Sequence, residues 1–202
     1  MNILFKPINE SGLLRTYFWW IIDSKLKKKQ LLHEYLDVQY KRHKLLLEEI
    51  VKKEKFYIHK KDIAIIKILR YVKQNYNYIT DFDNFKQIEL WEDIDEVIAN
   101  KKGDCESQNT LIYLLALATG ISQDQMFAFT CNSTVGGHFA IFYFTPEYSK
   151  IENKFQDGLF VIDSTFNVDL NYIEYRKPFK LGNGYKKIWH IFNQYFTWKF
   201  KQ

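Results

Sequence analysis

The feature that most constrains this chain is the stretch from Gly103 to Gly120, which places a cysteine at the start of an apolar helix. Asp104 is a residue type that caps helix N-termini, and Gly120 stands where a glycine commonly ends a helix. Four apolar residues between them recur at helical spacing: Leu111, Leu114, Leu115 and Ala118. The pattern predicts a buried helix with Cys105 in its first turn.

A thiol in that position lies beside backbone N–H groups that have no partner within the helix, and beside the positive end of the helix dipole. Both stabilise an anion, so we expect the pKa of the Cys105 thiol to be lowered and the nucleophilic thiolate to be favoured. The same N–H groups can hold an oxyanion. Cys105 is therefore the candidate nucleophile.

Acyl transfer by a thiolate also needs a base, and the base needs an orienting group. His138 follows two glycines at the start of an apolar segment, and Asp163 lies within the next predicted strand, 160–166. If these strands pair antiparallel, the start of one lies beside the end of the other, so His138 and Asp163 meet at one end of the sheet. His190 is a rival base, but it lacks the Gly-Gly context. The residues thus predict a triad of Cys105, His138 and Asp163.

In this order and with these local contexts, the motifs resemble the transglutaminase-like superfamily of papain-like fold, and most closely its small bacterial and phage-type members. The matching motifs are Trp91 before an acidic helix start, Gly103–Glu106, Gly120–Ile121, Gly136–His138 and Ile162–Thr165. The resemblance runs from Asp62 to Phe166. It departs from the pattern at Ser107, where relatives often have Asp, and at Phe139-Ala140, where they often have Ala-Trp.

The resemblance implies an α+β fold, with helices first and a central Cys105 helix packed on an antiparallel β-sheet. It also implies thiol-dependent acyl transfer at an amide or ester bond of a protein or peptide substrate. Water would complete the reaction in a cysteine peptidase or amidase, and an amine in protein-glutamine transamidation. Hydrolysis is slightly favoured, because nothing in the sequence marks an amine site. Tyr78 and Trp91 are weak candidates for a second oxyanion donor, and either could equally belong to the core.

The sequence predicts neither a cofactor nor a metal site. The two cysteines, Cys105 and Cys131, are too few for a disulfide framework and lack the short-range ligand spacing of zinc sites. Cys131 is expected to be a small buried side chain in a strand. Asp81, Asp83 and Asn84 form a polar cluster without the glycine of a calcium loop, so we interpret them as a turn.

The N-terminal part of the chain predicts one long helix from Ser24 to Lys55. Its stripe consists of Leu32, Leu36, Tyr40, His43, Leu47 and Ile50. Such a stripe suits packing on the same domain, which is somewhat favoured, or a short coiled coil with a partner. We expect a helical extension over 1–60 and a catalytic domain over 61–202. The alternative function is a catalytically silent binding or assembly module that uses this helix for a homo-oligomer or another partner.

Charge and hydropathy bear on whether the protein binds nucleic acid or spans a membrane. The formal net charge of +5 is mildly basic, but lysines and arginines alternate with acidic residues, so nucleic-acid binding is the weakest hypothesis. The apolar run from Thr16 to Ile22 is too short to span a bilayer, and no signal cleavage site follows it. We therefore expect a protein without a transmembrane segment, located in the cytoplasm or, if phage-encoded, in the virion.

Overall fold

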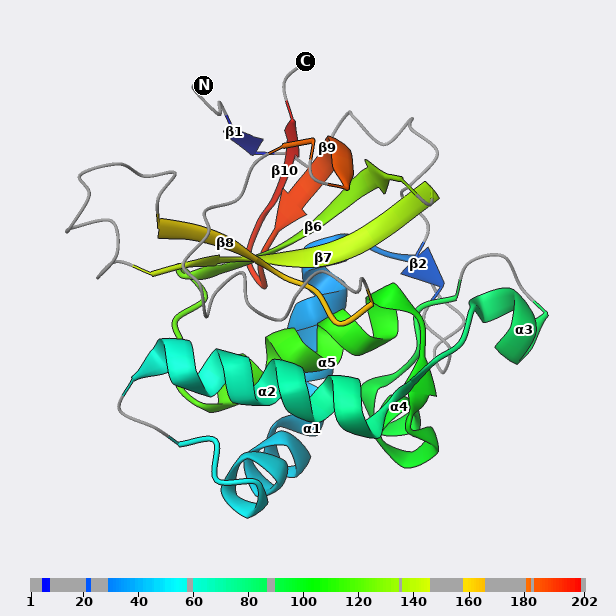
Figure 1. Cartoon of the computed structure of the whole chain (residues 1–202). Helices are drawn as coiled ribbons and strands as arrows, with labels where there is room; N and C mark the ends of the chain where they lie inside the picture. Colours follow the sequence, from blue (N-terminus) through cyan, green and yellow to red (C-terminus); the bar gives the residue numbers. More distant parts are fainter. Residues whose placement is uncertain are drawn as a thin grey trace.

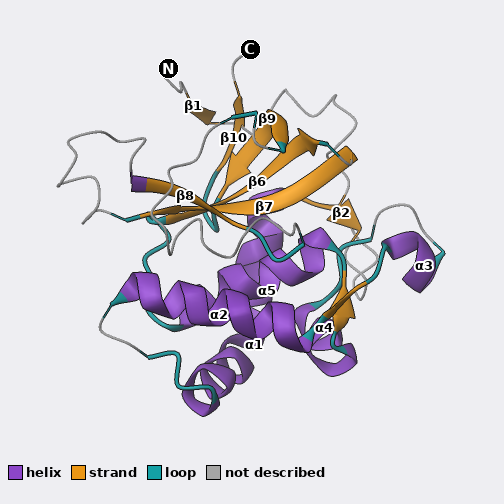
Figure 2. Ribbon diagram, in the orientation of Figure 1, coloured by secondary structure: helices purple, strands orange, loops and turns teal. Residues whose placement is uncertain are grey.

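The computed structural model describes residues 5–7, 21–22, 29–57, 60–86, 90–134, 136–145, 158–165, 181–182 and 184–200. Helices form one layer of the molecule and a β-sheet forms the other (Figure 1, Figure 2). The predicted α+β fold with an antiparallel sheet is therefore confirmed.

The helices are α1 Leu32–Lys53, α2 Lys61–Asn75, α3 Asp81–Phe85, α4 Ile94–Asn100 and α5 Cys105–Ala118. The strands of the main sheet are β1 Phe5–Pro7, β6 Met126–Ser133, β7 Gly136–Phe144, β8 Leu159–Ile162, β9 Tyr185–Phe192 and β10 Thr197–Phe200. Their order is β1-β10-β9-β6-β7-β8, and all neighbours are antiparallel. Two small pairs complete the fold: β2 Ile21–Ile22 with β3 Lys29–Gln30, and β4 Asn77–Tyr78 with β5 Lys102–Gly103.

The central element is α5, which lies between the sheet on one side and α1 and α2 on the other (Figure 1). Asp104 caps its N-terminus by accepting a hydrogen bond from the Ser107 N–H, and Gly120 follows its C-terminus with φ of 82°. Every residue from Cys105 to Leu117 is buried. From Leu111 onward this buried helix is apolar on all sides, which is why that part of its sequence is so rich in leucine.

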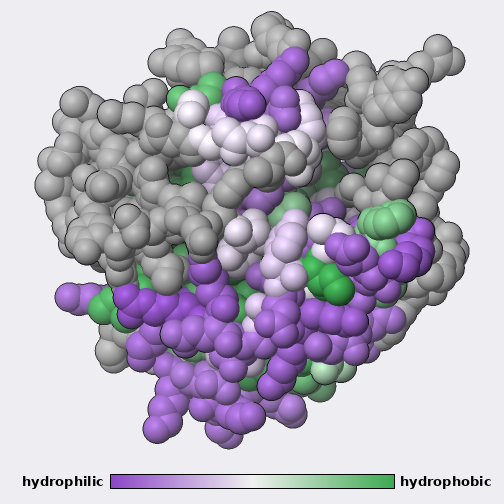
Figure 3. Space-filling model, turned by 45° about the vertical axis from the view of Figure 1, so that its right-hand side comes forward, coloured by the Kyte–Doolittle hydropathy of each residue, from purple (hydrophilic) through white to green (hydrophobic). Residues whose placement is uncertain are grey.

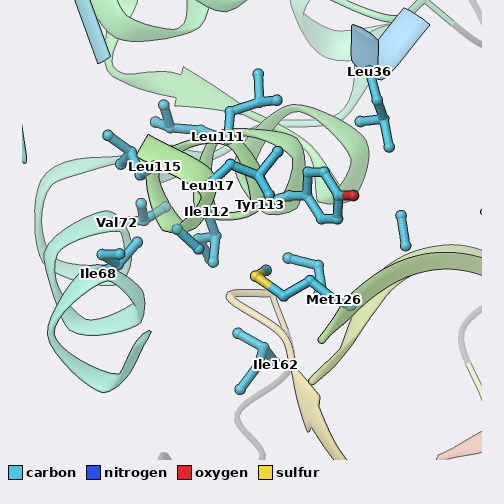
Figure 4. Packing of buried hydrophobic residues seen from close by; sticks show 14 of the residues in the cluster. Leu36, Ile68, Val72, Leu111, Ile112, Tyr113, Leu115, Leu117, Met126 and Ile162 are labelled. Carbon is cyan, nitrogen blue, oxygen red and sulfur yellow. The ribbon is translucent and has the colours of Figure 1, made fainter. Parts of the chain in front are cut away.

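The core joins all of these elements (Figure 4). Leu111 and Leu115 of α5 belong to the same buried cluster as Val72 of α2, Leu36 of α1 and Ile162 of β8. Burial of large aliphatic side chains from both layers stabilises the packing of the helices on the sheet, at about 1.5–3 kcal/mol for each side chain.

The long N-terminal helix starts later than the sequence suggested. Lys29–Gln30 is a strand, and α1 begins at Leu32, where the Glu34 carboxylate accepts a hydrogen bond from the Leu31 N–H. Leu36 and Leu47 of the predicted stripe face the core that α5 organises. The division at residue 60 stays a prediction.

The register of the sheet positions the candidate triad. Antiparallel pairing of β7 with β8 places Ile141 opposite Ile162, so the chain beyond Ile162 runs back alongside the start of β7. The predicted strand over 160–166 was too long: β8 ends at Ile162, and 163–165 form a turn, while Phe166 lies outside the described residues. The two aromatic segments near the C-terminus form β9 and β10.

Among the described residues, no helix combines the length and the apolar character that a membrane crossing requires. The face shown in Figure 3 is mostly hydrophilic over the helical layer. The apolar residues 16–20 lie outside the described part of the chain. Location in the cytoplasm or the virion stays a prediction.

Candidate functional site

His138 and Asp163 are brought together at the end of the sheet. The distance between His138 Nε2 and Asp163 Oδ2 is 2.6 Å, and both side chains are buried. Burial alone would raise the pKa of Asp163, but the hydrogen bond and charge of His138, with hydrogen bonds from Thr165 and Tyr185, lower it to about 2. Asp163 is therefore a carboxylate at neutral pH and can hold the imidazole in one orientation.

Other groups fix the Asp163 carboxylate from both sides. Its Oδ1 accepts hydrogen bonds from the backbone N–H and the hydroxyl of Thr165, each at 2.9 Å. Its Oδ2 also accepts one from the hydroxyl of Tyr185 on β9, at 2.7 Å. Sequence reasoning missed Tyr185, because its place beside Asp163 depends on how the strands are ordered in the sheet.

Cys105 is the first residue of α5, as predicted, and its thiol donates a hydrogen bond to Glu106 Oε2 at 2.7 Å. Burial raises the pKa of the thiol, as do the charges of Glu106 and Asp104 and the hydrogen bond to Glu106; a hydrogen bond from the Phe139 backbone lowers it. The net shift is well upward. The expected lowering by the helix N-terminus is therefore wrong for the protein alone, because burial and two adjacent carboxylates outweigh the helix dipole.

The two carboxylates beside Cys105 belong to an acidic cluster. Asp81 joins Asp104 and Glu106, and oxygens of the three buried groups lie within 4.8 Å of one another. Carboxylate oxygens are preferred ligands of calcium. The sequence did not indicate this cluster, since Asp81 belongs to a different helix and we interpreted it as part of a turn.

A second group of this kind consists of His43, Asp93 and Asp95. Here Asp93 is paired with Arg42 and with His43, whose Nε2 lies 2.5 Å from Asp93 Oδ1, and it also accepts a hydrogen bond from Gln39. The Arg42 guanidinium of α1 already pairs with this carboxylate, so the cluster fastens α1 to the start of α4.

The two weak oxyanion candidates have different surroundings. Tyr78 is 55% exposed, and burial of its hydroxyl, with the nearby charges of Cys105 and Asp104, raises its pKa. Its phenol therefore stays protonated and lies close to the candidate nucleophile. Trp91 is buried and packs edge-on against Phe139 and Tyr35, with ring centroids at 5.3 and 5.0 Å. That geometry suits a wall of the core.

His190 and Cys131 lie within the sheet. The His190 ring contacts the Thr130 hydroxyl at 3.1 Å, and burial, together with the charge of Lys199, lowers its pKa to about 4. Cys131 is fully buried opposite His138, as expected for a small core residue. Its thiol pKa is raised to about 12, by burial first and then by the charge of Asp163.

Ser107, one of the two departures from the family pattern, pairs with a buried carboxyl group. Its hydroxyl donates a hydrogen bond to Glu92 Oε2 at 2.6 Å. Burial raises the pKa of Glu92 to about 7, with the Ser107 bond opposing that shift. Gly103 permits this contact, because a Cβ there would lie 2.4 Å from the Ser107 Cβ and 2.9 Å from Glu92 Oε2.

No protein-family model matches the sequence, and no curated protein is significantly similar to it. Among solved structures, the chain is similar to LapG of Legionella pneumophila, with 18% identity and a TM-score of 0.55, over 83% of this chain and 87% of that chain. The calcium-bound form of that LapG gives 17% identity and the same TM-score over the same shares. A candidate cysteine protease from Cytophaga hutchinsonii gives 14% identity and a TM-score of 0.46, over 75% of this chain and 48% of that chain. The similarity to LapG shows that the chain has a transglutaminase-like fold, of the cysteine-protease-like kind that its motifs predicted.

Proposed function

We propose that this protein is a cysteine hydrolase that cleaves an amide or ester bond in a protein or peptide, with Cys105, His138 and Asp163 as its triad. The observation that carries the proposal is the bond of 2.6 Å between His138 and Asp163, at the end of the sheet that packs on the Cys105 helix. The Phe139 backbone, directly after His138, is hydrogen-bonded to the cysteine. One strand start thus carries the base and contacts the nucleophile.

In the proposed mechanism, His138 accepts the thiol proton while the Cys105 sulfur attacks the carbonyl carbon. The carbonyl oxygen gains negative charge, which the Cys105 N–H at the start of α5 and the Tyr78 hydroxyl would stabilise. The imidazolium then protonates the leaving group, with Asp163 holding the ring. Water releases the acyl group in the favoured reaction, and an amine would release it in transamidation.

We extend the proposal to a calcium ion at the acidic cluster. LapG has a calcium-bound form, and the three buried carboxylates of Asp81, Asp104 and Glu106 supply the hard oxygen ligands that calcium prefers. Bound there, a divalent cation would offset the two charges that raise the pKa of Cys105. The carboxylates would hold the cation, and the thiol would ionise more easily beside it.

The test is the pH dependence of alkylation at Cys105, measured by mass spectrometry with and without added calcium. Cys131 in the same sample is the internal control, since it is buried in the sheet. We expect calcium to move Cys105 reactivity to lower pH, and His138→Ala to abolish that reactivity. An unchanged profile in His138→Ala would remove the proposed triad.

The calcium site has its own test. Titration calorimetry should detect calcium binding to the wild type, loss of binding in Asp81→Asn, and retention in Asp83→Asn, which removes an exposed carboxylate from the same short helix. Equal binding by both variants would refute the site without affecting the triad.

The alternative function, a silent binding or assembly module, depends on the stripe of α1. Leu36 and Leu47 of that stripe are fully buried within the chain, which leaves them unable to contact a partner. A stable monomer in solution would count against this alternative. We therefore rank it below hydrolysis.

A further inference from the structure

Asn109 lies one helical turn after Cys105, on the same face of α5. Its side chain is fully buried, and it makes four hydrogen bonds. Nδ2 donates to the Phe139 carbonyl at 2.8 Å and to Asp163 Oδ1 at 3.3 Å. Oδ1 accepts from the N–H and the hydroxyl of Ser164, at 2.9 and 3.1 Å. A carboxamide has two donor hydrogens and two acceptor lone pairs, so all of its capacity is used.

The partners of Asn109 are the neighbours of the proposed triad. Phe139 follows His138 on β7, and Ser164 follows Asp163 in the turn after β8. One side chain on the cysteine helix therefore contacts both segments that carry the other two members. Sequence periodicity could not indicate this role, because a polar residue at a buried helix position identifies no partner.

Asn109 also occupies a place that a strand fills elsewhere along β7. The pairing of β7 with β8 covers Ile141–Phe144, and Phe139 lies beyond it. At Phe139, residues of α5 bond to the edge of β7 in place of a neighbouring strand. The Phe139 carbonyl accepts a hydrogen bond from Asn109 Nδ2, and the Phe139 backbone is hydrogen-bonded to Cys105. Helix residues 105 and 109 together dock on a single strand residue.

We propose that Asn109 is a positioning residue of this site, which holds His138 and Asp163 in register with the Cys105 helix through its carboxamide. The inference rests on the proposed function, and it adds a residue that acts through the triad without touching the substrate. A neutral amide suits the position, because it donates to the Asp163 carboxylate and accepts from Ser164. A carboxylate of the same size could accept the hydrogen bonds from Ser164 but could not donate one to Asp163.

Two substitutions of Asn109 test the donor and acceptor hydrogen bonds of its carboxamide separately. Asn109→Ala removes all four, whereas Asn109→Asp keeps the acceptor for Ser164 and turns a second oxygen toward the Phe139 carbonyl and Asp163. Thr110→Val is the matched control, since Thr110 is equally buried, and its hydroxyl has no hydrogen-bond partner among the described residues. Thermal unfolding followed by circular dichroism would report on folding in each case.

The deciding measurement is the NMR signal of the His138 ring N–H that is bonded to Asp163, assigned by its loss in His138→Ala. We expect Thr110→Val to keep the signal. Asn109→Ala should speed its exchange with water by about tenfold or more, because a buried carboxylate loses a donor and its turn loses an anchor. Asn109→Asp should erase the signal while the protein remains folded.

A lower unfolding temperature with an unchanged ring N–H signal in both Asn109 variants would overturn the proposal, since it would assign Asn109 a purely structural role. Cys105 alkylation separates this result from failure of the proposed function. If wild-type reactivity did not depend on His138, the hydrolase proposal would fail, while the NMR comparison would still decide whether Asn109 positions the His138–Asp163 pair.

Discussion

Two buried histidine–aspartate pairs occur in the described part of this chain, and the distances between their nitrogen and oxygen atoms are nearly the same, but only the His138–Asp163 contact has the geometry of a hydrogen bond. His138 Nε2 lies 2.6 Å from Asp163, and His43 Nε2 lies 2.5 Å from Asp93. Their surroundings differ. Asp93 is shared with the guanidinium of Arg42, within the helical layer, whereas Asp163 receives hydrogen bonds from Tyr185 and from the turn that follows it.

The difference shows that a short histidine–aspartate contact does not by itself identify a catalytic site. At Asp93 the carboxylate is already paired with the Arg42 guanidinium, so His43 is only one of two partners from α1. At Asp163 the hydrogen bonds from Tyr185 and Thr165 come from neutral groups, so the carboxylate keeps a full charge for an imidazolium. Only this second pair lies beside the segment that contacts Cys105.

The largest expected effect concerns the stability of the helical-layer pair. Asp93→Asn should lower the free energy of unfolding by about 3–5 kcal/mol, because it removes the buried carboxylate that pairs with the Arg42 guanidinium and contacts His43. Urea denaturation measures this loss. Asp37→Asn is the control, since Asp37 forms a surface pair with Lys41 that is worth under about 1 kcal/mol. A loss as small as that of the control would mean that the network does not hold α1.

The next effect concerns the alkylation of Cys105, for which Asp163 should matter more than Asp93. Asp163→Asn should reduce His138-dependent alkylation of Cys105 by about a hundredfold near neutral pH, because the imidazolium loses its counter-charge. Asp93→Asn, measured where it is still folded, should leave that rate unchanged. Equal losses in the two variants would break the functional distinction between the pairs.

Acid unfolding gives a third, smaller difference. The pKa of Asp163 is lowered from 3.8 to about 2, so its contribution to stability is present above about pH 4 and is lost as the pH falls toward 2. The shift corresponds to about 2 kcal/mol. Unfolding free energies measured from pH 5 down to pH 2 should therefore fall more steeply for the wild type than for Asp163→Asn. Parallel curves would show that the carboxylate titrates normally in the folded protein.

The smallest expected effect comes from Tyr185→Phe, which removes only the hydroxyl that donates to Asp163. The loss of one hydrogen bond to a charged group should lower the free energy of unfolding by about 1–2 kcal/mol and change Cys105 alkylation only severalfold. Tyr195→Phe, at an exposed position, is the matched control. A drop in alkylation as large as that of Asp163→Asn would show that Tyr185 is as important for Cys105 reactivity as Asp163.

Several features of the molecule could be predicted from the sequence because they depend on contacts within one or two turns. Asp104 and Gly120 bound α5 through local capping and a positive φ, and the leucines between them follow the helical period. The Gly-Gly-His segment starts a strand, and the next strand ends at Ile162, directly before Asp163. Antiparallel pairing then follows from ordinary sheet geometry, which is why the meeting of His138 and Asp163 could be anticipated.

Other features were decided only by the tertiary structure. Tyr185 reaches Asp163 from β9, three places away from β8 in the sheet, and Asp81 joins Asp104 from a separate helix. The direction of the Cys105 pKa shift was predicted wrongly from the helix N-terminus, because burial and neighbouring carboxylates are properties of the folded protein. Local sequence therefore determined which elements form and where they end. The charges and hydrogen bonds inside the site depend on packing between residues far apart in the chain. The local spacing of apolar and polar residues does not determine that packing.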